Sequence, residues 1–417
     1  MTKKNDEKLY RGYTVRLFPT PEQEDLMWKH VHASRFIWNY MLALQVARYE
    51  NGRKHLSAFD MCKELTYMRK ECEFEWLNEV SLHSLQQVCR DLEQAYKMYF
   101  KRNGKRPKFK KKKMRSISFP LAQSINNTYF KNKNEFVTIK IKHIKCDHNY
   151  NIPIGRKDKG RNPICDHQIQ YIKSSGKWIL TFVMECEKQA PELTDESMGI
   201  DLGVKELAVV ALGDKKIVFH NINKSKRMRQ LEKKRKYIQR VIDRKYRTYN
   251  GFGTPKKGQT WEKSKNIEKY EQMLREIDAK MSNIRHNYIH QVTRQLVNML
   301  PERVVMEDLN VSTMVKNKYL SKSISEQNFY FFIHTMKYKC EEYGIEFVQA
   351  DRWFPSSKLC SYCGCKNTEL TLNDREWTCQ KCGMHHDRDY NAAINLMNYT
   401  EKISTTANNL VSTKLSA

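Results

Sequence analysis

Two closely spaced cysteine pairs near the C-terminal end restrict the fold of this chain more than any other sequence feature. Cys360-Ser-Tyr-Cys363 and Cys379-Gln-Lys-Cys382 enclose fifteen residues. Each CxxC turn presents two thiolates to one ion, and the intervening loop closes a tetrahedral site, as in structural zinc centres. We therefore predict a zinc ribbon with these four cysteines as ligands. Cys365 is an additional thiol, either free or an alternative ligand.

The charge of the chain predicts a polyanionic partner. Lys and Arg total 75 against 47 Asp and Glu over 417 residues, a net charge of +28. Nucleic acid is the first candidate for this partner, and an anionic membrane surface is the second. No apolar run reaches the roughly 18 residues that a membrane span needs, and the N-terminus lacks a signal-peptide core. We expect a soluble, cytoplasmic protein with no membrane partner, whose twelve cysteines are reduced or bind metal.

Patterns in the first half of the chain predict one strand, then helices, then further strands. Residues 10–18 alternate and carry β-branched and aromatic side chains, as a strand does. Thr20 is placed to cap a helix that begins at Pro21. Residues 136–144 are among the later predicted strands, which together favour a small β-barrel. The predicted boundaries are 1–20 for the first barrel strand, 21–103 for a helical module and 104–190 for the rest of the barrel.

A basic run follows the helical module. Positions 101–115 hold ten basic residues and no acidic one, so no packed core can form there. Such a run is often only a solvated loop, but in a chain of this charge we favour contact with phosphate. The Lys/Arg-rich stretch 224–247 is a further candidate for holding a nucleic-acid backbone. The predicted nucleic-acid contacts of the basic run are Lys105, Arg106, Lys108, Lys110, Lys111, Lys112, Lys113 and Arg115.

The second half of the chain predicts an α/β domain interrupted by a helical hairpin. Apolar residues recur every three or four positions on the C-terminal side of a glycine-containing loop at 251–258, which favours two long helices within 224–300. The predicted boundaries are 191–355 for this domain, 356–383 for the zinc ribbon, 384–399 for the last domain segment and 400–417 for a disordered tail.

Three carboxylates stand where predicted elements begin or end. Asp201 closes an apolar strand, Glu307 closes another, and Asp389 opens a helix. Carboxylates clustered in this way suit two divalent ions about 4 Å apart that promote phosphodiester cleavage. Their hard oxygen atoms suit magnesium. Each carboxylate alone has a plainer interpretation as a turn residue or a cap, and Asp387 competes with Asp389 for the third position.

Together these motifs resemble the transposon-encoded TnpB nucleases and their relatives, the miniature type V CRISPR effectors. The resemblance extends along nearly the whole chain. Its strongest matches are Gly199-Ile-Asp-Leu-Gly-Val204, Val305-Met-Glu-Asp-Leu-Asn310, Asp351-Arg-Trp-Phe-Pro-Ser-Ser-Lys358 and His386-Asp-Arg-Asp-Tyr-Asn-Ala-Ala393. Further matches lie at 16–23, 34–39, 85–92 and 107–111.

The resemblance implies a multidomain α/β protein with an RNase H-like (RuvC) nuclease domain. The helical module would be its recognition module, the barrel its wedge domain and the ribbon its target nucleic-acid-binding part. It implies Asp201, Glu307 and Asp389 as catalytic ligands of two magnesium ions, and a structural zinc in the ribbon. The implied activity is a magnesium-dependent endonuclease that uses a structured guide RNA and cuts complementary DNA beside a short flanking motif. We expect a monomer or homodimer in a bacterial or archaeal cytoplasm.

Other interpretations stay open. A miniature type V CRISPR effector is barely distinguishable from the transposon-encoded form by sequence. An RNA-guided DNA-binding regulator without catalysis is a second alternative, and the intact carboxylate set argues against it. A transposase that joins strands is a third, because RNase H-like acidic triads also support that chemistry.

Overall fold

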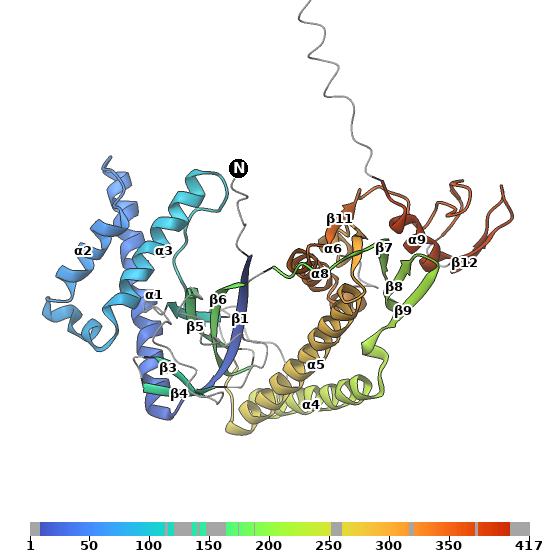
Figure 1. Ribbon diagram of the computed structural model, residues 1–417. Coiled ribbons are helices and arrows are strands. Elements are labelled where there is room, and N and C mark those ends of the chain that lie inside the picture. The colour runs from blue at the N-terminus through green and yellow to red at the C-terminus, as the bar shows by residue number, and fades with distance from the viewer. Residues whose placement is uncertain are drawn as a thin grey trace, which may run out of the picture. The chain divides into compact units, whose positions relative to one another are not determined.

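The computed structural model (Figure 1) divides into two compact units, Met1–Glu187 and Lys188–Ala417. The residues that it describes are 9–112, 116–120, 136–139, 142–146, 164–173, 175–186, 188–251, 261–316, 321–371 and 374–400. The predicted tail therefore lies outside the described residues, apart from Thr400. None of the described helices is long and apolar enough to cross a membrane.

The first unit opens with one strand and a group of helices, as predicted. Thr20 caps the first helix through a capping box with Gln23, in which each side chain accepts from the other residue's backbone amide. The apolar faces of the helices in this unit form one core. A short 3₁₀ segment, which the sequence patterns did not predict, lies between the second and third helices. The elements are β1 (Leu9–Phe18), α1 (Pro21–Glu50), α2 (Ala58–Met68), η1 (Cys72–Glu79) and α3 (Leu82–Phe100).

A six-stranded sheet completes the first unit, in the order β2-β5-β6-β1-β4-β3. β1 lies between β6 and β4, so the predicted return of the first strand is confirmed. The single strand predicted at 136–144 is wrong, because β3 and β4 form a hairpin with Ile139 opposite Lys142. The described ladders include none between the outer strands β2 and β3, so barrel closure stays a prediction. The strands are β2 (Ser116–Pro120), β3 (Phe136–Ile139), β4 (Lys142–Cys146), β5 (Ile164–Ile172) and β6 (Lys177–Cys186).

The second unit contains a five-stranded sheet in the order β11-β10-β7-β8-β9. β7, β10 and β11 are parallel, β8 pairs antiparallel with β7, and β9 pairs antiparallel with β8. Its strands are β7 (Thr194–Leu202), β8 (Glu206–Leu212), β9 (Lys215–His220), β10 (Pro301–Glu307) and β11 (Glu346–Ala350), with a separate hairpin of β12 (Glu376–Thr378) and β13 (His385–Asp387).

The helices of the second unit include the two predicted long helices, now bounded as α4 and α5. Their apolar faces pack together in one cluster, as a helical hairpin requires. The helices are η4 (Ile222–Lys224), α4 (Lys226–Asn250), α5 (Lys265–Val297), α6 (Val311–Met314), α7 (Ser321–Gln327), α8 (Phe329–Tyr343) and α9 (Arg388–Met397).

Side chains of the central strands alternate between two helical layers. In β10, Met306 packs with α5 and α8 on one face, whereas Val305 packs with α9 on the other. In β7, Ile200 joins the layer of α5 and α8. Successive side chains of a strand point to opposite faces. Asp201 and Glu307 are therefore directed to the face that α9 covers.

Helix α9 lies unusually close to β7 because the strand has no side chain at Gly199. A Cβ atom built there would lie 2.0 Å from the carbonyl oxygen of Ala393 and 2.3 Å from the backbone nitrogen of Met397. Both atoms belong to the helix backbone, which cannot rotate away as a side chain can. Glycine at this position therefore sets the distance between the helix and the sheet.

We expect Gly199→Ala to destabilise the second unit by about 1–3 kcal/mol, the usual cost of overpacking a core. The helix would have to move away from the sheet to admit the methyl group. Thermal unfolding of the full chain measures this as a lowered midpoint. Gly12→Ala in β1 is the matched control, because its Cβ would meet nothing within 4 Å. Equal unfolding midpoints for Gly199→Ala and Gly12→Ala would contradict the close contact between α9 and β7 at Gly199.

Candidate functional site

Strand register brings the first two predicted carboxylates side by side. In the parallel ladder of β7 and β10, Ile200 is opposite Met306. The next residues along the two strands are Asp201 and Glu307, and both are directed to the α9 face. Asp389 lies in the first turn of α9. The structure therefore brings together the three carboxylates that the sequence singled out.

These carboxylates act on one another electrostatically. Desolvation raises the pKa of Asp201 well above its usual range, and the nearby Glu307 and Asp389 carboxylates raise it further. Desolvation also raises the pKa of Glu307. Arg388 opposes both shifts. A cluster of carboxylates whose charge is not fully compensated provides oxygen ligands suited to a hard divalent cation.

The structure separates the roles of the two competing aspartates. Asp387 is the N-cap of α9: its Oδ1 accepts from the backbone amides of Asp389 and Tyr390 at 3.0 Å. Its Oδ2 lies 2.9 Å from Nζ of Lys216. Desolvation would raise the pKa of Asp387, but the Tyr390 amide and Lys216 lower it below its ordinary value. The capping role therefore belongs to Asp387, while Asp389 lies close enough to Asp201 to raise its pKa.

Three residues that the sequence did not single out as site residues surround the carboxylates. The buried Ser356 donates a hydrogen bond from Oγ to Oε1 of Glu307. Nη1 of Arg375 lies 3.5 Å from Oδ1 of Asp389. Arg388 donates from Nη1 to the carbonyl oxygen of Thr371 at 2.8 Å, which holds its guanidinium near the site. The only advance signal was that Ser356 and Arg388 stand inside motifs shared with the TnpB nucleases.

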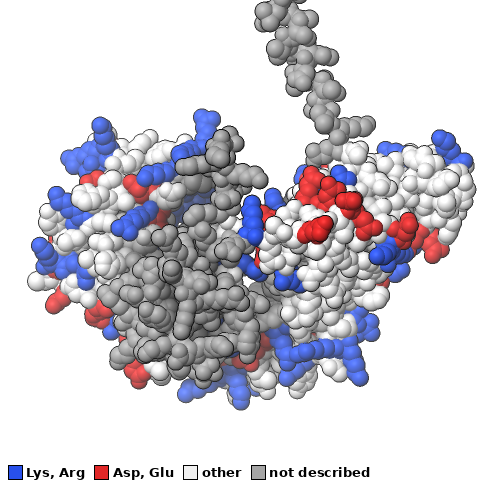
Figure 2. Space-filling model, in the orientation of Figure 1, with Lys and Arg blue, Asp and Glu red and all other residues white. Residues whose placement is uncertain are grey.

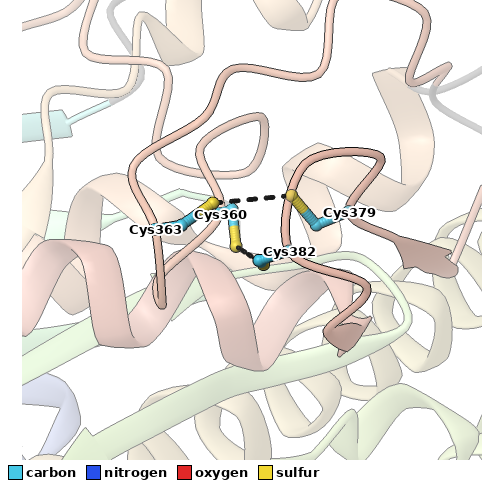
Figure 3. Close-up of side chains that lie close together, drawn as sticks. All are labelled: Cys360, Cys363, Cys379 and Cys382. Carbon is cyan, nitrogen blue, oxygen red and sulfur yellow. Dashed lines mark hydrogen bonds between the residues drawn. The ribbon is translucent and has the colours of Figure 1, made fainter.

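The four predicted zinc ligands converge on one point (Figure 3). All their Sγ atoms lie within 4.8 Å of one another, and the pairs Cys360–Cys382 and Cys363–Cys379 are 3.6 Å apart. Sulfur atoms about 3.8 Å apart would surround a tetrahedral zinc with bonds of about 2.3 Å. Within the described residues no other set of His, Cys, Asp and Glu donors is this close, so the three carboxylates form a wider group.

The surroundings act differently on the four thiols: desolvation and neighbouring thiols raise the pKa of Cys382 to about 12, and desolvation raises the pKa of Cys360. Hydrogen bonds from the backbone amides of Cys382 and Lys381 lower the pKa of the Cys379 thiol to about 6, and the thiolate is the form that binds metal. Cys365 is not part of the set. It contributes its backbone instead, since its carbonyl oxygen accepts from the amide of Cys360 at 2.9 Å.

Two asparagines connect the cysteine knuckle to the helix that carries Asp389. The buried Asn391 donates to the carbonyl of Leu359 at 2.6 Å and accepts from the amide of Ser361 at 2.9 Å. One turn later, Asn395 donates to the carbonyls of Ser356 and Leu359, each at 2.7 Å. The hydrogen bonds of these two side chains thus fix the turn before the first CxxC pair to α9.

His386 connects the ribbon to the start of the same helix. It is buried, its Nε2 lies 3.0 Å from Sγ of Cys360, and its ring packs against Trp377. β13, which contains His386, pairs with β12, so the ribbon hairpin continues to Asp387, beyond the predicted end at 383. Helix α9 begins at the next residue.

The basic run is better ordered than a solvated loop. Trp38 of α1 donates to the carbonyl of Lys108 at 3.0 Å. The Asn39 side chain both accepts from the Lys110 amide at 2.7 Å and donates to its carbonyl at 3.1 Å. Nζ of Lys110 lies 4.0 Å from the centre of the Trp38 ring, and desolvation lowers its pKa. Lys110 therefore packs on the protein, which weakens its prediction as a phosphate contact.

The remaining predicted contacts of this run divide into two groups. The exposed ones are Lys105, Arg106, Lys108, Lys111 and Lys112. Lys113 and Arg115 lie outside the described residues. The bonds from α1 hold the backbone at Lys108 and Lys110, and the exposed cations around this point suit a phosphate backbone.

Helix α4 presents a second basic surface, and Figure 2 shows Lys and Arg side chains where Figure 1 draws this helix. Arg240, Arg244 and Arg247 line a groove there with Asp243 and Thr248. Glu232, on the same helix, pairs with Lys322. The exposed basic residues of α4 are Lys226, Arg227, Arg229, Lys233, Lys234, Lys236, Arg240, Arg244 and Arg247.

Comparisons with known proteins find relatives along nearly the whole chain. Three family models match: "Helix-turn-helix domain" at residues 9–54, "Probable transposase" at 181–318 and "Cas12f1-like, TNB domain" at 329–396. A Streptomyces pristinaespiralis protein, "Putative RNA-guided DNA endonuclease", is 29% identical over 94% of this chain and 89% of its own length. Escherichia coli K12 "Putative RNA-guided DNA endonuclease InsQ" is 26% identical over 94% and 92%. The resemblance predicted from the motifs is confirmed.

A solved structure shares the fold. The "Cryo-EM structure of the Cas12f1-sgRNA-target DNA complex" contains a chain that superimposes with a TM-score of 0.55 at 13% identity, over 94% of this chain and 99% of that one. At this identity the likeness concerns the fold alone.

We expect the purified protein to contain about one zinc per chain, because four thiolates of this spacing complete a closed tetrahedral site. Cys379→Ser should reduce the zinc content to near zero, as measured by elemental analysis. Cys365→Ser is the matched control and should keep its zinc, since that residue supplies only a backbone carbonyl to the knuckle. Loss of zinc from both variants, or from neither, would contradict the assignment.

Asp201→Asn should stabilise the protein at pH 8 in the absence of magnesium. A carboxyl whose pKa is raised in the folded state lowers stability as pH rises above its unfolded value of about 3.9, and the loss is complete above the raised pKa. The amide has no such loss, so its advantage should grow from pH 5 to pH 8 in thermal unfolding. Magnesium should reduce the difference in unfolding midpoint between Asp201→Asn and the wild-type protein, because it stabilises the wild type. Equal unfolding midpoints at pH 8 would contradict the electrostatic account.

Proposed function

We propose that this chain, which resembles the TnpB nucleases along nearly its whole length, is an RNA-guided DNA endonuclease. It binds a structured guide RNA and cuts complementary DNA beside a short flanking motif. The observation that carries this proposal is the convergence of Asp201, Glu307 and Asp389 on one face of the β7–β10 ladder. The relatives that cover 94% of the chain support it, since both carry that activity in their names.

An RNase H-like nuclease domain accounts for the second unit. Three parallel strands continue into two antiparallel ones, with α5 and α8 on one face and α9 on the other. The likeness to the Cas12f1 chain supports the same fold. The helical hairpin of α4 and α5 and the ribbon, whose β12–β13 hairpin continues to Asp387, are then insertions between the segments that carry the three carboxylates.

The three carboxylates would hold two magnesium ions, which when bound activate water and stabilise the oxygen that leaves the DNA phosphate. The chain's own residues prepare the site for this. Ser356 fixes the orientation of the Glu307 carboxylate by hydrogen bonding. Arg388 favours the ionised forms of Asp201 and Glu307, which are the forms that bind cations.

The ribbon would hold a structural zinc. Four sulfur ligands leave no open position for water, so this ion would not take part in cleavage. Its contribution is mechanical, because the knuckle is fixed to α9 through Asn391 and Asn395. The ribbon thereby stabilises the helix start on which Asp389 lies.

The guide RNA and target DNA would contact the basic surfaces. In RNA-guided nucleases the guide reads the target by base pairing, and the protein holds the backbones and reads the short flanking motif. The exposed lysines and arginine of the basic run and the exposed face of α4 supply cations in two separate places. We assign both to the phosphate backbones.

A miniature type V CRISPR effector is the second candidate. The match of residues 329–396 to the "Cas12f1-like, TNB domain" model and the shared fold favour it specifically. A repeat array beside the gene would indicate the CRISPR form, and a transposon end overlapping the gene would indicate the TnpB form. The chemistry at the carboxylates is the same in both.

Asp201→Ala should reduce magnesium-dependent DNA cleavage by about a hundredfold or more, because the site loses several kcal/mol of transition-state stabilisation. Guide RNA binding should be retained, since the basic surfaces are untouched. The measurement is cleavage of a labelled target by protein purified with its co-expressed flanking RNA. Asp214→Ala, an exposed carboxylate in the β8–β9 turn, is the control and should cleave normally.

Cleavage retained by the Asp201→Ala complex would reject the catalytic assignment. Joined product from labelled DNA ends would instead favour the transposase interpretation. A wild-type complex that holds its RNA tightly and binds the target DNA without cutting it would favour the RNA-guided regulator without catalysis.

A further inference from the structure

Trp353 is the most exposed large apolar side chain of the described residues, at 85%. Its indole has no aromatic or cation partner among the residues that the structure describes. A single exposed aromatic side chain is ordinary by itself, so the case for a role depends on where the turn places the indole. The proposed function gives this residue no role.

The exposure of Trp353 is built into a well-fixed turn. Its own backbone amide donates to Oδ1 of Asp351 at 2.7 Å, and the Phe354 amide donates to the Asp351 carbonyl at 2.9 Å. Phe354 then packs edge-on against Tyr399, with ring centres 4.9 Å apart. The turn is therefore anchored on both sides of the indole, and folding presents the ring to solvent in a defined place.

This turn begins beside the carboxylate site. β11 is the parallel neighbour of β10, and its last residue, Ala350, is opposite Glu307. Arg352, the residue before the indole, forms an ion pair with Asp308, the residue after Glu307. Ser356, three positions further, hydrogen bonds to Glu307 itself. Residues before and after Trp353 thus contact the end of β10, where Glu307 lies.

The surroundings of the turn favour a nucleic-acid occupant over an apolar protein surface. Arg352 precedes the indole in sequence and pairs with Asp308, and Arg375 pairs with Asp389 of the carboxylate site; both guanidinium groups are still about half exposed. Cations next to an exposed aromatic ring fit a chain of phosphates that carries stacked bases. Stacking on a base does not require a particular sequence, because every base has a π face.

We propose that Trp353 stacks on an unpaired base of the DNA strand being cut and so positions the scissile phosphate at the carboxylates. This rests on the proposed function. The contact makes Trp353 a substrate-positioning residue that holds one flank of the cleavage site. It implies that the strand enters the site with at least one base unpaired near the cut.

The first experiment compares single-turnover cleavage by guide-loaded wild type, Trp353→Ala and Trp353→Phe. Stacking on an aromatic ring is expected to change the rate at subsaturating DNA by about 5- to 150-fold. Trp353→Ala should show that loss, whereas Trp353→Phe should keep most of the activity because it retains a ring. Tyr330→Ala is the matched control, since it removes an aromatic ring 73% exposed on α8. Wild-type rates for Trp353→Ala would overturn the proposal.

The second experiment locates the base. Targets with a single abasic residue at successive positions around the cut are tested with wild type and Trp353→Ala. At one position the abasic target should slow the wild-type enzyme and abolish the further loss caused by Trp353→Ala. The same loss from Trp353→Ala at every abasic position would show that the indole acts through the protein fold, and would overturn the proposal.

A third readout does not depend on cleavage. In the Asp201→Ala complex, 5-iodouracil placed at the position so identified, or at each flanking position in turn, should photocrosslink to the peptide that contains Trp353. A crosslink to that peptide supports the contact even if the complex cuts no DNA, so failure of the proposed function is separately visible. Crosslinks confined to other peptides would overturn the proposal.

Discussion

The close contact between the backbone of α9 and β7 at Gly199 is the interaction on which the candidate site depends. A strand and a helix approach so closely only where no Cβ intervenes. The helix in turn carries Asp389 to the two strands that present Asp201 and Glu307. Asn391 and Asn395 on the same helix hold the cysteine knuckle. One missing side chain thus sets the geometry of both the carboxylate group and the attachment of the ribbon.

Bringing the three carboxylates together lowers the stability of the folded unit, and the neighbouring residues compensate this loss only in part. Desolvation and mutual repulsion raise the pKa of Asp201, and Arg388 opposes the shift without removing it. Clusters of this kind are retained at functional sites although they lower stability. The two layers of apolar packing around the sheet and the fixed ribbon supply the rigidity that holds the like charges together.

The fold positions two kinds of charged group: the cations of the basic run, and the carboxylates of Asp201, Glu307 and Asp389. The basic run is held against α1 by Trp38 and Asn39, so its exposed side chains start from a defined backbone. Lys110 differs from these side chains, because its ammonium group lies over the indole of Trp38, which weakens its prediction as a phosphate contact. A nucleic-acid ligand of the proposed kind would be held at such fixed cations and cut at the carboxylates.

Local features of this chain could be predicted from sequence because they depend on neighbours a few positions away. These features include the CxxC pairs, the Thr20 cap, the strand predicted at 10–18 and the two long helices, all of which the structure has. The resemblance to known nucleases then indicated which carboxylates to consider together. A continuous β-pattern hid the turn between β3 and β4, because both arms of a tight hairpin carry the same residue types.

Only the tertiary structure assigned the cap to Asp387 and placed Asp389 close enough to Asp201 to raise its pKa. It also revealed the hydrogen bond from Ser356 to Glu307 and the packing of Lys110 on Trp38. Each of these outcomes depends on which residues distant in sequence become neighbours. The parallel register of β7 and β10 pairs segments about a hundred positions apart, and a side chain's partners at that separation follow from packing that no local pattern encodes.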